Sequence, residues 1–261
     1  MLRSLYTAAT GMNAQQVKMD VTAHNLANAS TTGYKKTRAE FEDLLSERIR
    51  TPGPAQAQGG SAPSPLEVGL GVRTAATTRS MAQGDLVNTQ NPLDVAIQGQ
   101  GFFRVSRPNG EYAYTRAGNF RVDATGRLVT QQGEMIDPQI IVPNETTDLT
   151  IRSDGVVLAK LANREAPQEL GTLELTMFTN PGGLSAIGGN LYAATMGAGD
   201  PVQVRPGEQG SGHLTQGFLE TANVKAVEEM IDMITTQRAY ELNSKVIQTA
   251  DAMLQKLTNL R

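Results

Sequence analysis

Apolar residues recur every seven positions near both ends of the chain, with polar residues between them. Near the N-terminus the recurring residues are Leu5, Met12, Met19 and Leu26. Toward the C-terminus they are Met233, Tyr240, Ile247 and Leu254. A seven-residue repeat is typical of helices that pack along one narrow stripe. The pattern predicts an amphipathic helix at each end, pairing in a coiled-coil-like manner. The same stripes are candidate interfaces to other copies, and two surface helices on a single globule are the alternative.

The central part of the chain follows a period of two rather than seven. Apolar residues alternate at five places, namely Val95 and Ile97, Phe103 and Val105, Tyr112 and Tyr114, Phe120 and Val122, and Leu173 to Met177. Gly-containing turn sequences such as PNG at 108–110 and DATG at 123–126 separate these runs. Short alternating runs between turns are typical of antiparallel strands. We predict an antiparallel β domain over residues 95–205, and with the terminal helices an α+β fold.

The region between the first helix and the β domain carries mixed signals. A basic stretch from Lys35 to Arg50 is predicted to be partly helical, and the sequence LEVGLGVRT that begins at Leu66 reads as a strand. Residues 51–65, TPGPAQAQGGSAPSP, contain no aromatic and no branched aliphatic residue. Their prolines are Pro52, Pro54, Pro63 and Pro65. Composition alone predicts a linker or a long exposed loop here.

Composition and charge exclude several function classes. A net charge of -3 gives no electrostatic footprint for nucleic acid or an anionic membrane. No apolar run approaches the roughly 18 residues of a membrane span, and the first residues lack the apolar core of a signal peptide. We therefore expect no direct membrane insertion, and export without a cleaved signal if the protein works outside the cytoplasm. The chain has no Cys, which removes disulfides and thiolate chemistry.

No residues in the sequence form a recognisable catalytic, cofactor-binding or metal-binding pattern. His24 and His213 lack a second ligand at metal-binding spacing, and most Asp residues lie beside turns. The run GQGQGFF lacks the Lys and Ser/Thr of a phosphate-binding loop. We instead expect Gly99 and Gly101 to permit a bulge or a close backbone approach. The sequence predicts no enzyme and no cofactor.

Three blocks of the sequence resemble the bacterial flagellar basal-body rod and hook family. HNLANASTTGYKK, which begins at His24, is similar to its N-terminal signature, an Asn-Leu-Ala-Asn core followed by Thr-x-Gly-Tyr/Phe-Lys. GFLETANVKAVEEMIDMITTQRAYELNSKVIQTADAMLQKL resembles its C-terminal signature, and DVAIQGQGFFRV with YTRAGNFRVDATGRLVTQQG resembles its β domain. The blocks occur in the family's order and cover nearly the whole chain. Length and the Pro/Gly-rich segment point to the distal-rod branch of the family.

The resemblance implies a structural subunit of an axial tube that crosses the periplasm and transmits torque from motor to hook. It implies three regions: an inner helical domain (1–32 and 217–261), a linking domain (33–94 and about 206–216) and an outer β domain (95–205). It also implies that residues 45–66 are a rod-stiffening insertion, which conflicts with the flexible linker that composition predicts. We follow the resemblance and expect an ordered, packed extension in the assembled tube.

The resemblance also suggests a role for the polar residues that follow the first predicted helix. We expect them to form a helix exit motif through which the chain leaves the inner layer, since Asn, Gly, Ser and Thr suit such a break. Its candidate residues are Asn25, Asn28, Thr31, Gly33, Tyr34 and Lys35. Tyr34, Lys35 and Lys36 are expected between layers, paired with acidic groups of a neighbour. A plain helix cap is the alternative.

The implied partners are other copies in the tube, proximal rod and hook subunits at its ends, the surrounding peptidoglycan-layer and outer-membrane rings, and the flagellar type III export apparatus. Three alternatives stay open at this point. A proximal rod or hook subunit shares all three blocks. A periplasmic peptidoglycan- or polysaccharide-binding module needs exposed aromatics, which a chain without Trp poorly supplies. A wall hydrolase needs paired carboxylates or a metal site.

Overall fold

The structure is a computed structural model that describes residues 2–50, 66–162 and 166–259. It divides into two compact units. The first, here called the helical unit, comprises Met1–Leu26, Thr37–Thr78 and Lys225–Arg261. The second, here called the β unit, comprises Ala27–Lys36 and Arg79–Val224. The predicted linking region 33–94 thus contributes residues to both units.

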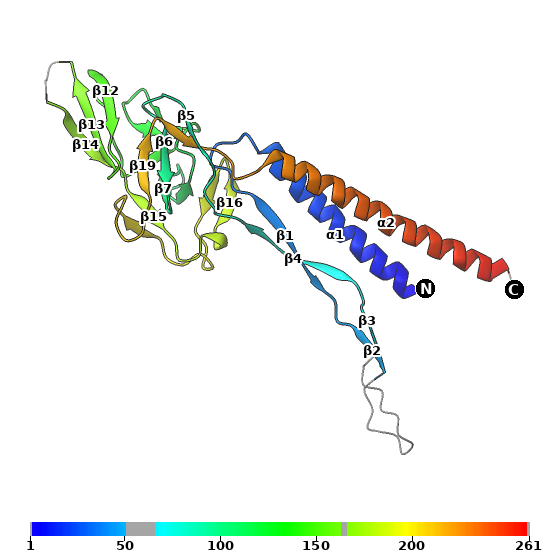
Figure 1. Ribbon diagram of the computed structural model, residues 1–261. Helices are drawn as coiled ribbons and strands as arrows, with labels where there is room; N and C mark the ends of the chain where they lie inside the picture. The colour runs from blue at the N-terminus through cyan, green and yellow to red at the C-terminus, as the bar shows by residue number, and fades with distance from the viewer. Residues whose placement is uncertain (1, 51–65, 163–165, 260–261) are drawn as a thin grey trace. The chain divides into compact units, whose positions relative to one another are not determined.

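The helical unit contains one long helix from each end of the chain, so the predicted terminal helices are confirmed. They are α1 (Leu2–Ala27) and α2 (Ala226–Asn259). The two lie side by side and run in opposite directions (Figure 1). At Gly11 the approach is so close that an added Cβ would lie 3.0 Å from Asn243 Nδ2. The last residues of α1 and the first of α2 also meet, where Asn25 donates a hydrogen bond to Glu229.

Two short strand pairs complete the helical unit. Strand β1 (Thr37–Asp43) pairs with β4 (Val72–Arg79), and β2 (Glu47–Arg50) pairs antiparallel with β3 (Leu66–Val68). The prediction of a partly helical segment over Lys35–Arg50 is therefore wrong. In β1 half-buried and exposed residues alternate along most of the strand, as strand geometry requires. Its partner strand is far enough along the chain that no local signal indicated the pairing.

The Pro/Gly-rich segment falls between β2 and β3. All four of its prolines, Pro52, Pro54, Pro63 and Pro65, lie outside the described residues. Its conformation in the assembled state, and its role as a stiffening insertion, stay predictions.

A nine-stranded sheet forms the centre of the β unit. Seven strands follow one another in the order β16-β17-β8-β7-β11-β10-β9, with β15 joined to β7 and β18 joined to β15. Their bounds are β7 Phe102–Ser106, β8 Tyr112–Thr115, β9 Arg121–Val122, β10 Leu128–Val129, β11 Met135–Asp137, β15 Leu175–Met177, β16 Ser185–Gly188, β17 Leu191–Ala193 and β18 Val202–Val204. A short 3-10 helix, Pro181–Gly183, precedes β16.

Three smaller sheets accompany it among the described residues of the β unit. One has the order β12-β13-β14, and the others pair β19 with β6 and β20 with β5. Their bounds are β5 Leu86–Asn88, β6 Val95–Gln98, β12 Thr146–Ile151, β13 Val156–Leu161, β14 Gln168–Thr172, β19 His213–Gln216 and β20 Phe218–Glu220. The strand pairings described in these four sheets are antiparallel, which confirms the predicted antiparallel β domain.

Strand β7 has a buried core on each of its faces. Phe103 and Val105 belong to the main hydrophobic cluster, whereas Phe102 points into a second, aromatic cluster. In that second cluster the rings of Tyr114 and Phe178 meet edge to face at 4.8 Å. Neighbouring residues of a strand point to opposite sides, so a strand buried on both sides loses simple alternation. The two cores fix β7 at the centre of the unit.

The loop that leads into β7 makes the close backbone approach that the sequence predicted. Gly99 and Gly101 have φ values of 118° and 129°, which side chains other than glycine rarely adopt. A Cβ on Gly99 would lie 2.8 Å from the Cα of Gly212. The loop therefore presents its carbonyl groups without a covering side chain.

Candidate assembly interface

The face of α1 that turns toward α2 is lined by small and polar side chains. The buried residues of α1 are Ala8, Ala14, Thr22 and Asn25, and of these Asn25 bonds α2 directly. On α2 the buried residues are Glu229, Thr236 and Ala250, and Asn243 lies against Gly11. These side chains bury little apolar area, so the free energy gained from pairing the two helices within one chain is small.

The predicted apolar stripes flank this seam rather than fill it. Leu5, Met12, Met19 and Leu26 are half-buried on α1. On α2 Met233, Ile247 and Leu254 are half-buried and Tyr240 is exposed. Large apolar side chains at the edge of a contact are available to further neighbours. Their role as an interface between copies stays a prediction.

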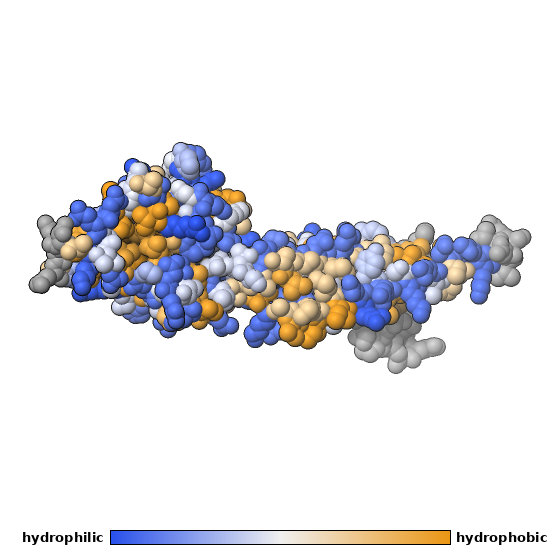
Figure 2. Space-filling model, turned by 90° about the horizontal axis from the view of Figure 1, so that it is seen from above, coloured by the Kyte–Doolittle hydropathy of each residue, from blue (hydrophilic) through white to orange (hydrophobic). Residues whose placement is uncertain are grey.

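A second apolar stripe of α2 points away from α1. Ile234 is 57% exposed, whereas Thr236 in the seam is 1% exposed. Residues two positions apart in a helix are separated by about 200° around its axis, so Ile234 and Thr236 lie on opposite sides of α2. The exposed large apolar residues of α2 are Val227, Met230, Ile231, Ile234, Tyr240, Leu242, Val246 and Met253. Figure 2 shows apolar surface exposed along the helical part of the molecule.

Asn25 joins three segments of the helical unit. Its Nδ2 donates to the Thr37 carbonyl at 2.8 Å and to Glu229 Oε2 at 3.1 Å. Its Oδ1 accepts from the Thr37 amide at 2.9 Å. The side chain thus bonds both backbone groups of the first residue of β1 and the carboxylate of α2. This is a positioning role for one candidate exit-motif residue.

The turn after α1 is held by local hydrogen bonds. The Thr31 amide donates to the Asn28 carbonyl at 3.0 Å, and the Thr31 hydroxyl donates to Asn28 Oδ1 at 3.3 Å. Gly33 has a φ of 69°, and its amide donates to the Glu220 carbonyl at 2.8 Å. A Cβ at Gly33 would lie 2.7 Å from the Ala117 amide nitrogen. Glycine is required here by both backbone conformation and space.

Lys35 lies in a buried cluster of charges, here called the ion cluster, with Arg116 and Glu220. The three side chains are 1%, 4% and 0% exposed. Lys35 Nζ lies 2.6 Å from Glu220 Oε1 and also donates to the Ala82 carbonyl at 2.7 Å. The Gly84 amide donates to the same carboxylate oxygen at 2.9 Å. The acidic partner of Lys35 therefore comes from the same chain, not from a neighbour as the sequence analysis expected.

Arg116 completes the ion cluster from the β unit's main sheet. Its Nε lies 3.0 Å from Glu220 Oε2, a close ion pair that lacks hydrogen-bond geometry. Its terminal nitrogens donate to the Gly101 carbonyl at 2.6 Å and the Gly99 carbonyl at 2.8 Å. Burial lowers the pKa of both Lys35 and Arg116, and the Glu220 carboxylate opposes that shift. One carboxylate thus faces two enclosed cations, which are further satisfied by backbone carbonyls.

Asn223, in the C-terminal block, forms hydrogen bonds with residues close to the ion cluster. The Lys36 amide donates to Asn223 Oδ1 at 2.6 Å, and Asn223 Nδ2 donates to the Ser80 and Ala82 carbonyls, each at 3.0 Å. Tyr34 is buried in a small cluster with Ala222 and Val224. No sequence pattern indicated a role for Asn223, Glu220 or Arg116, although the first two lie inside the C-terminal block.

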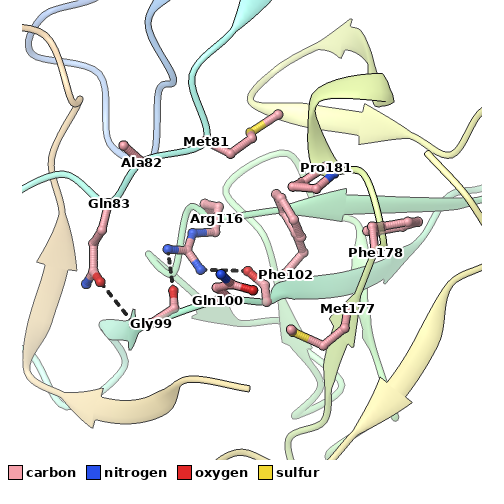
Figure 3. A pocket seen from close by; sticks show the side chains of 11 residues that line it. Met81, Ala82, Gln83, Gly99, Gln100, Phe102, Arg116, Met177, Phe178 and Pro181 are labelled. Carbon is pink, nitrogen blue, oxygen red and sulfur yellow. Dashed lines mark hydrogen bonds between the residues drawn. The ribbon is translucent and has the colours of Figure 1, made fainter. Parts of the chain in front are cut away.

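A pocket of about 400 Å³ lies beside the ion cluster (Figure 3). Its apolar walls are formed by Met81, Phe102, Met177, Phe178 and Pro181, with Arg116 at its edge. The guanidinium is already used by two carbonyls and Glu220, so it offers no unsatisfied cation to a ligand.

The candidate residues for other chemistry are scattered. His24 on α1 and His213 on β19 are exposed, and among the described residues there is no group of three His, Asp or Glu placed to hold a metal. Asp94 accepts hydrogen bonds from Thr89 and Asn91, as a turn residue does. No helix in the described part of the chain is long and apolar enough to span a membrane.

Comparison with known proteins gives matches along the whole chain. Residues 5–35 match the family model "Flagella basal body rod protein", residues 96–159 match "Flagellar hook protein FlgE/F/G D1 domain", and residues 215–260 match "Flagellar basal body rod FlgEFG protein C-terminal". The chain is similar to the flagellar basal-body rod protein FlgG of Buchnera aphidicola subsp. Acyrthosiphon pisum, with 46% identity over 100% of both chains. It is 46% identical to that of Borreliella burgdorferi, over 100% of this chain and 99% of the relative. The FlgG of Bacillus subtilis is 39% identical over 100% of both chains.

Proposed function

The chain belongs to the flagellar basal-body rod protein family, and we propose that it assembles into the stiff distal part of the rod. It is a structural rod subunit of the basal body rather than an enzyme, because its full-length relatives are named as rod proteins. Its neighbours are other copies of itself and rod and hook proteins. The peptidoglycan- or polysaccharide-binding alternative is not retained.

The exposed stripe of α2 is the observation that carries the assembly proposal. A helix that buries small and polar residues on one side and exposes Ile234, Leu242 and Val246 on the other needs further partners to bury them. Full burial of each such side chain is worth roughly 1.5–3 kcal/mol. The flanking residues of the seam supply more apolar area. We propose that neighbouring copies cover both sets and thereby form a coiled-coil-like inner layer.

This arrangement favours a tube over a closed dimer. A contact between different surfaces of identical subunits is heterologous, and repeated heterologous contacts build rings or helical filaments. The stripe of α2 and the apolar flanks of the seam are different surfaces of one helix pair. Contacts between these two surfaces therefore do not close into a two-fold dimer, and membership of the rod family favours the helical outcome over a ring.

The ion cluster supports a role for the β unit in transmitting force along the rod. Lys35 and Glu220 join two distant segments of the β unit, and their contact is buried and supported by further hydrogen bonds. Such networks rigidify the structure that contains them. We propose that the ion cluster limits bending of the β unit as torque passes along the rod.

Further features of the proposal follow from the distal-rod position. We propose a periplasmic location, delivery through the flagellar export apparatus without a cleaved signal, and surrounding peptidoglycan-layer and outer-membrane rings. Residues 45–66 are proposed to stiffen the tube, as the resemblance of this chain to distal rod proteins implies. Deleting this segment is expected to give tubes that curve more strongly in electron micrographs.

A pair of charge substitutions tests the assembly interface. Ile234→Glu and Leu242→Glu place a charge on the exposed stripe, where burial against a neighbour would be costly. Gln131→Glu is the matched control, because it adds the same charge at an exposed position of the β unit, away from α2. We expect the critical concentration for polymerisation of the purified full chain, measured by sedimentation and electron microscopy, to rise at least about tenfold for the stripe variants. Equal assembly of all three variants would remove the stripe from the interface.

A further inference from the structure

The apolar repeats alone do not determine how α1 and α2 align. Leu5, Met12 and Met19 recur every seven residues, as do Met233, Tyr240 and Ile247 on the opposing helix. If one helix slides by seven residues, most of these side chains meet equivalent partners again. Hydrophobic contact is non-directional, so it distinguishes such registers poorly. Something other than the apolar stripe has to select the observed alignment.

The contact between Asn25 and Glu229 occurs once along the helix pair. Both side chains are 1% exposed, and the Asn25 amide donates to Glu229 Oε2 at 3.1 Å. Asn25 is already fixed by two hydrogen bonds to Thr37, so its amide cannot follow a displaced carboxylate. The carboxylate also lies in the first turn of α2, where a helix favours negative charge.

A second unique contact lies fourteen residues away on each helix, at Gly11 and Asn243. An added Cβ at Gly11 would lie 3.0 Å from Asn243 Nδ2, so a larger residue would require the Asn243 side chain to shift. The two contacts are separated by the same number of residues on both helices. They therefore specify one and the same antiparallel register.

We propose that the Asn25–Glu229 hydrogen bond, supported by the close approach at Gly11 and Asn243, sets the register in which the terminal helices pair. Single buried polar contacts are known to select register in helix pairs whose apolar repeat is otherwise degenerate. Glu229 is thus a specificity-determining residue of the helix pair. The inference concerns alignment within one chain and is independent of tube assembly.

The energetic reason is the distance that a slip would open. Sliding by seven residues moves a helix by about 10.5 Å, far beyond hydrogen-bond reach. The carboxylate and the amide would then each lose a partner in a buried setting. Losing one hydrogen bond to a charged group corresponds to a population ratio of about 10- to 100-fold between registers. The selected register in turn determines which apolar residues of α1 lie beside which apolar residues of α2.

Engineered cysteine pairs can report the register directly, because the chain has no Cys of its own. Lys18 and Thr236 lie midway between the two contacts, seven residues from each, and should face each other in the native register. The pair K18C/T236C therefore reports the native register, and S4C/T236C reports a register shifted by fourteen residues, which is two repeats, while leaving Gly11, Asn25, Glu229 and Asn243 in place. Initial rates of intramolecular disulfide formation in the full-length protein, measured by mass spectrometry, give the ratio of the two.

Three substitutions are compared in both cysteine backgrounds. Glu229→Leu removes the contact while leaving Asn25 bonded to Thr37, and Glu229→Gln keeps an acceptor for the Asn25 amide. Glu228→Leu is the matched control, because Glu228 is the adjacent acid but is exposed and pairs with Lys225 of its own helix region. We expect the shifted pair to form at least about tenfold more slowly than the native pair in the parent, Glu228→Leu and Glu229→Gln proteins. In Glu229→Leu the two rates should become similar.

Several outcomes would overturn the proposal. Equal rates in the parent protein would mean that the structure's register is not selected. An unchanged ratio in Glu229→Leu would mean that Glu229 does not select it. Loss of both disulfides in that variant would show that Glu229 holds the helices together instead of aligning them. Polymerisation is measured separately, so a failure of tube assembly leaves this reading unaffected.

Discussion

Lys35 and Glu220 are 185 residues apart in sequence, yet Lys35 Nζ lies 2.6 Å from Glu220 Oε1 in a site closed to water. Each residue belongs to a different terminal block of the sequence. Arg116 joins them from a strand connection inside the β unit. The site cannot form until residues from three distant segments are present together. It therefore couples the folding of three distant segments of the β unit.

Removing the Lys35 ammonium should destabilise the β unit strongly. Lys35→Met preserves much of the side-chain volume but leaves Glu220 with one cationic partner in a buried setting. Breaking a buried ion pair on one side costs about 3–5 kcal/mol. Denaturant unfolding of the full-length protein, followed by circular dichroism, measures the change. Lys225→Ala is the control, since its ion pair with Glu228 is exposed and should contribute less than about 1 kcal/mol. Similar losses in the two variants would contradict the importance of the buried cluster.

Gly33 should tolerate substitution less well than another glycine with a similar backbone. Gly33 and Gly110 have φ values of 69° and 82°, but only Gly33 faces backbone atoms, at Ala117. A left-handed conformation costs an alanine about 1–2 kcal/mol at both sites. Crowding should add about 1–3 kcal/mol for Gly33→Ala alone. Comparing the unfolding free energies of Gly33→Ala and Gly110→Ala isolates the crowding. If both variants lose the same stability, the contact with Ala117 is not restrictive.

The seven-residue repeat predicted the two terminal helices but not the side chains between them. A repeat shows that a stripe exists, and neighbouring rows share its period. The row containing Met12 and Met19 was therefore indistinguishable in period from the row containing Gly11, Lys18 and Asn25. The prediction took the row of large apolar residues as the contact between the helices. In the structure, the close approach of the helices instead places the row of small and polar residues between them. Only the position of the second helix distinguishes them.

The error at β1 has a different origin. The segment TRAEFED has the alternation of a strand, but its charges also suit a helix, and its partner β4 begins at Val72. The ion cluster was equally hidden, because Lys35, Arg116 and Glu220 carry no local pattern. Helices, turns and the antiparallel domain were encoded locally and were predicted. Contacts between distant segments depend on the completed fold and were not.

Stability should fall in alkaline solution because of a buried tyrosine. Burial raises the pKa of Tyr192 above its usual value of about 10, and the nearby Arg79 only partly opposes this. The folded state then retains a proton that the unfolded state loses. Stability is therefore complete below about pH 10 and is lost as the pH rises toward the raised pKa. Urea unfolding between about pH 9 and 11 measures the slope.

The slope should decrease in Tyr192→Phe, which cannot ionise. It should persist in Tyr6→Phe, a control substitution at a tyrosine that is 57% exposed. A Tyr192→Phe protein with the parent's full alkaline slope would assign the effect to another group.

Trypsin should cleave the helices of the dilute protein before it cleaves the β unit. Arg238 and Lys245 are exposed on α2, whose pairing with α1 rests on small and polar residues. Arg116 is enclosed in the β unit by Glu220 and two backbone carbonyls. Local opening is easiest where few apolar contacts hold the backbone, so early fragments should end at Arg238 or Lys245. Intact-mass measurements over a time course identify these ends.

Assembly should then protect the same helical sites. Neighbouring copies that cover the exposed stripe of α2 suppress the local opening that cleavage needs. In the polymer, cleavage after Arg238 and Lys245 should therefore be reduced more than cleavage at other sites. Exposed sites of the β unit are an internal reference, since a general loss of trypsin access would slow them equally. Helical sites that resist trypsin already in the dilute protein would mean that the single chain suffices to hold the pair. The exposed stripe would then have no role in stabilising the helices, although it could still join copies.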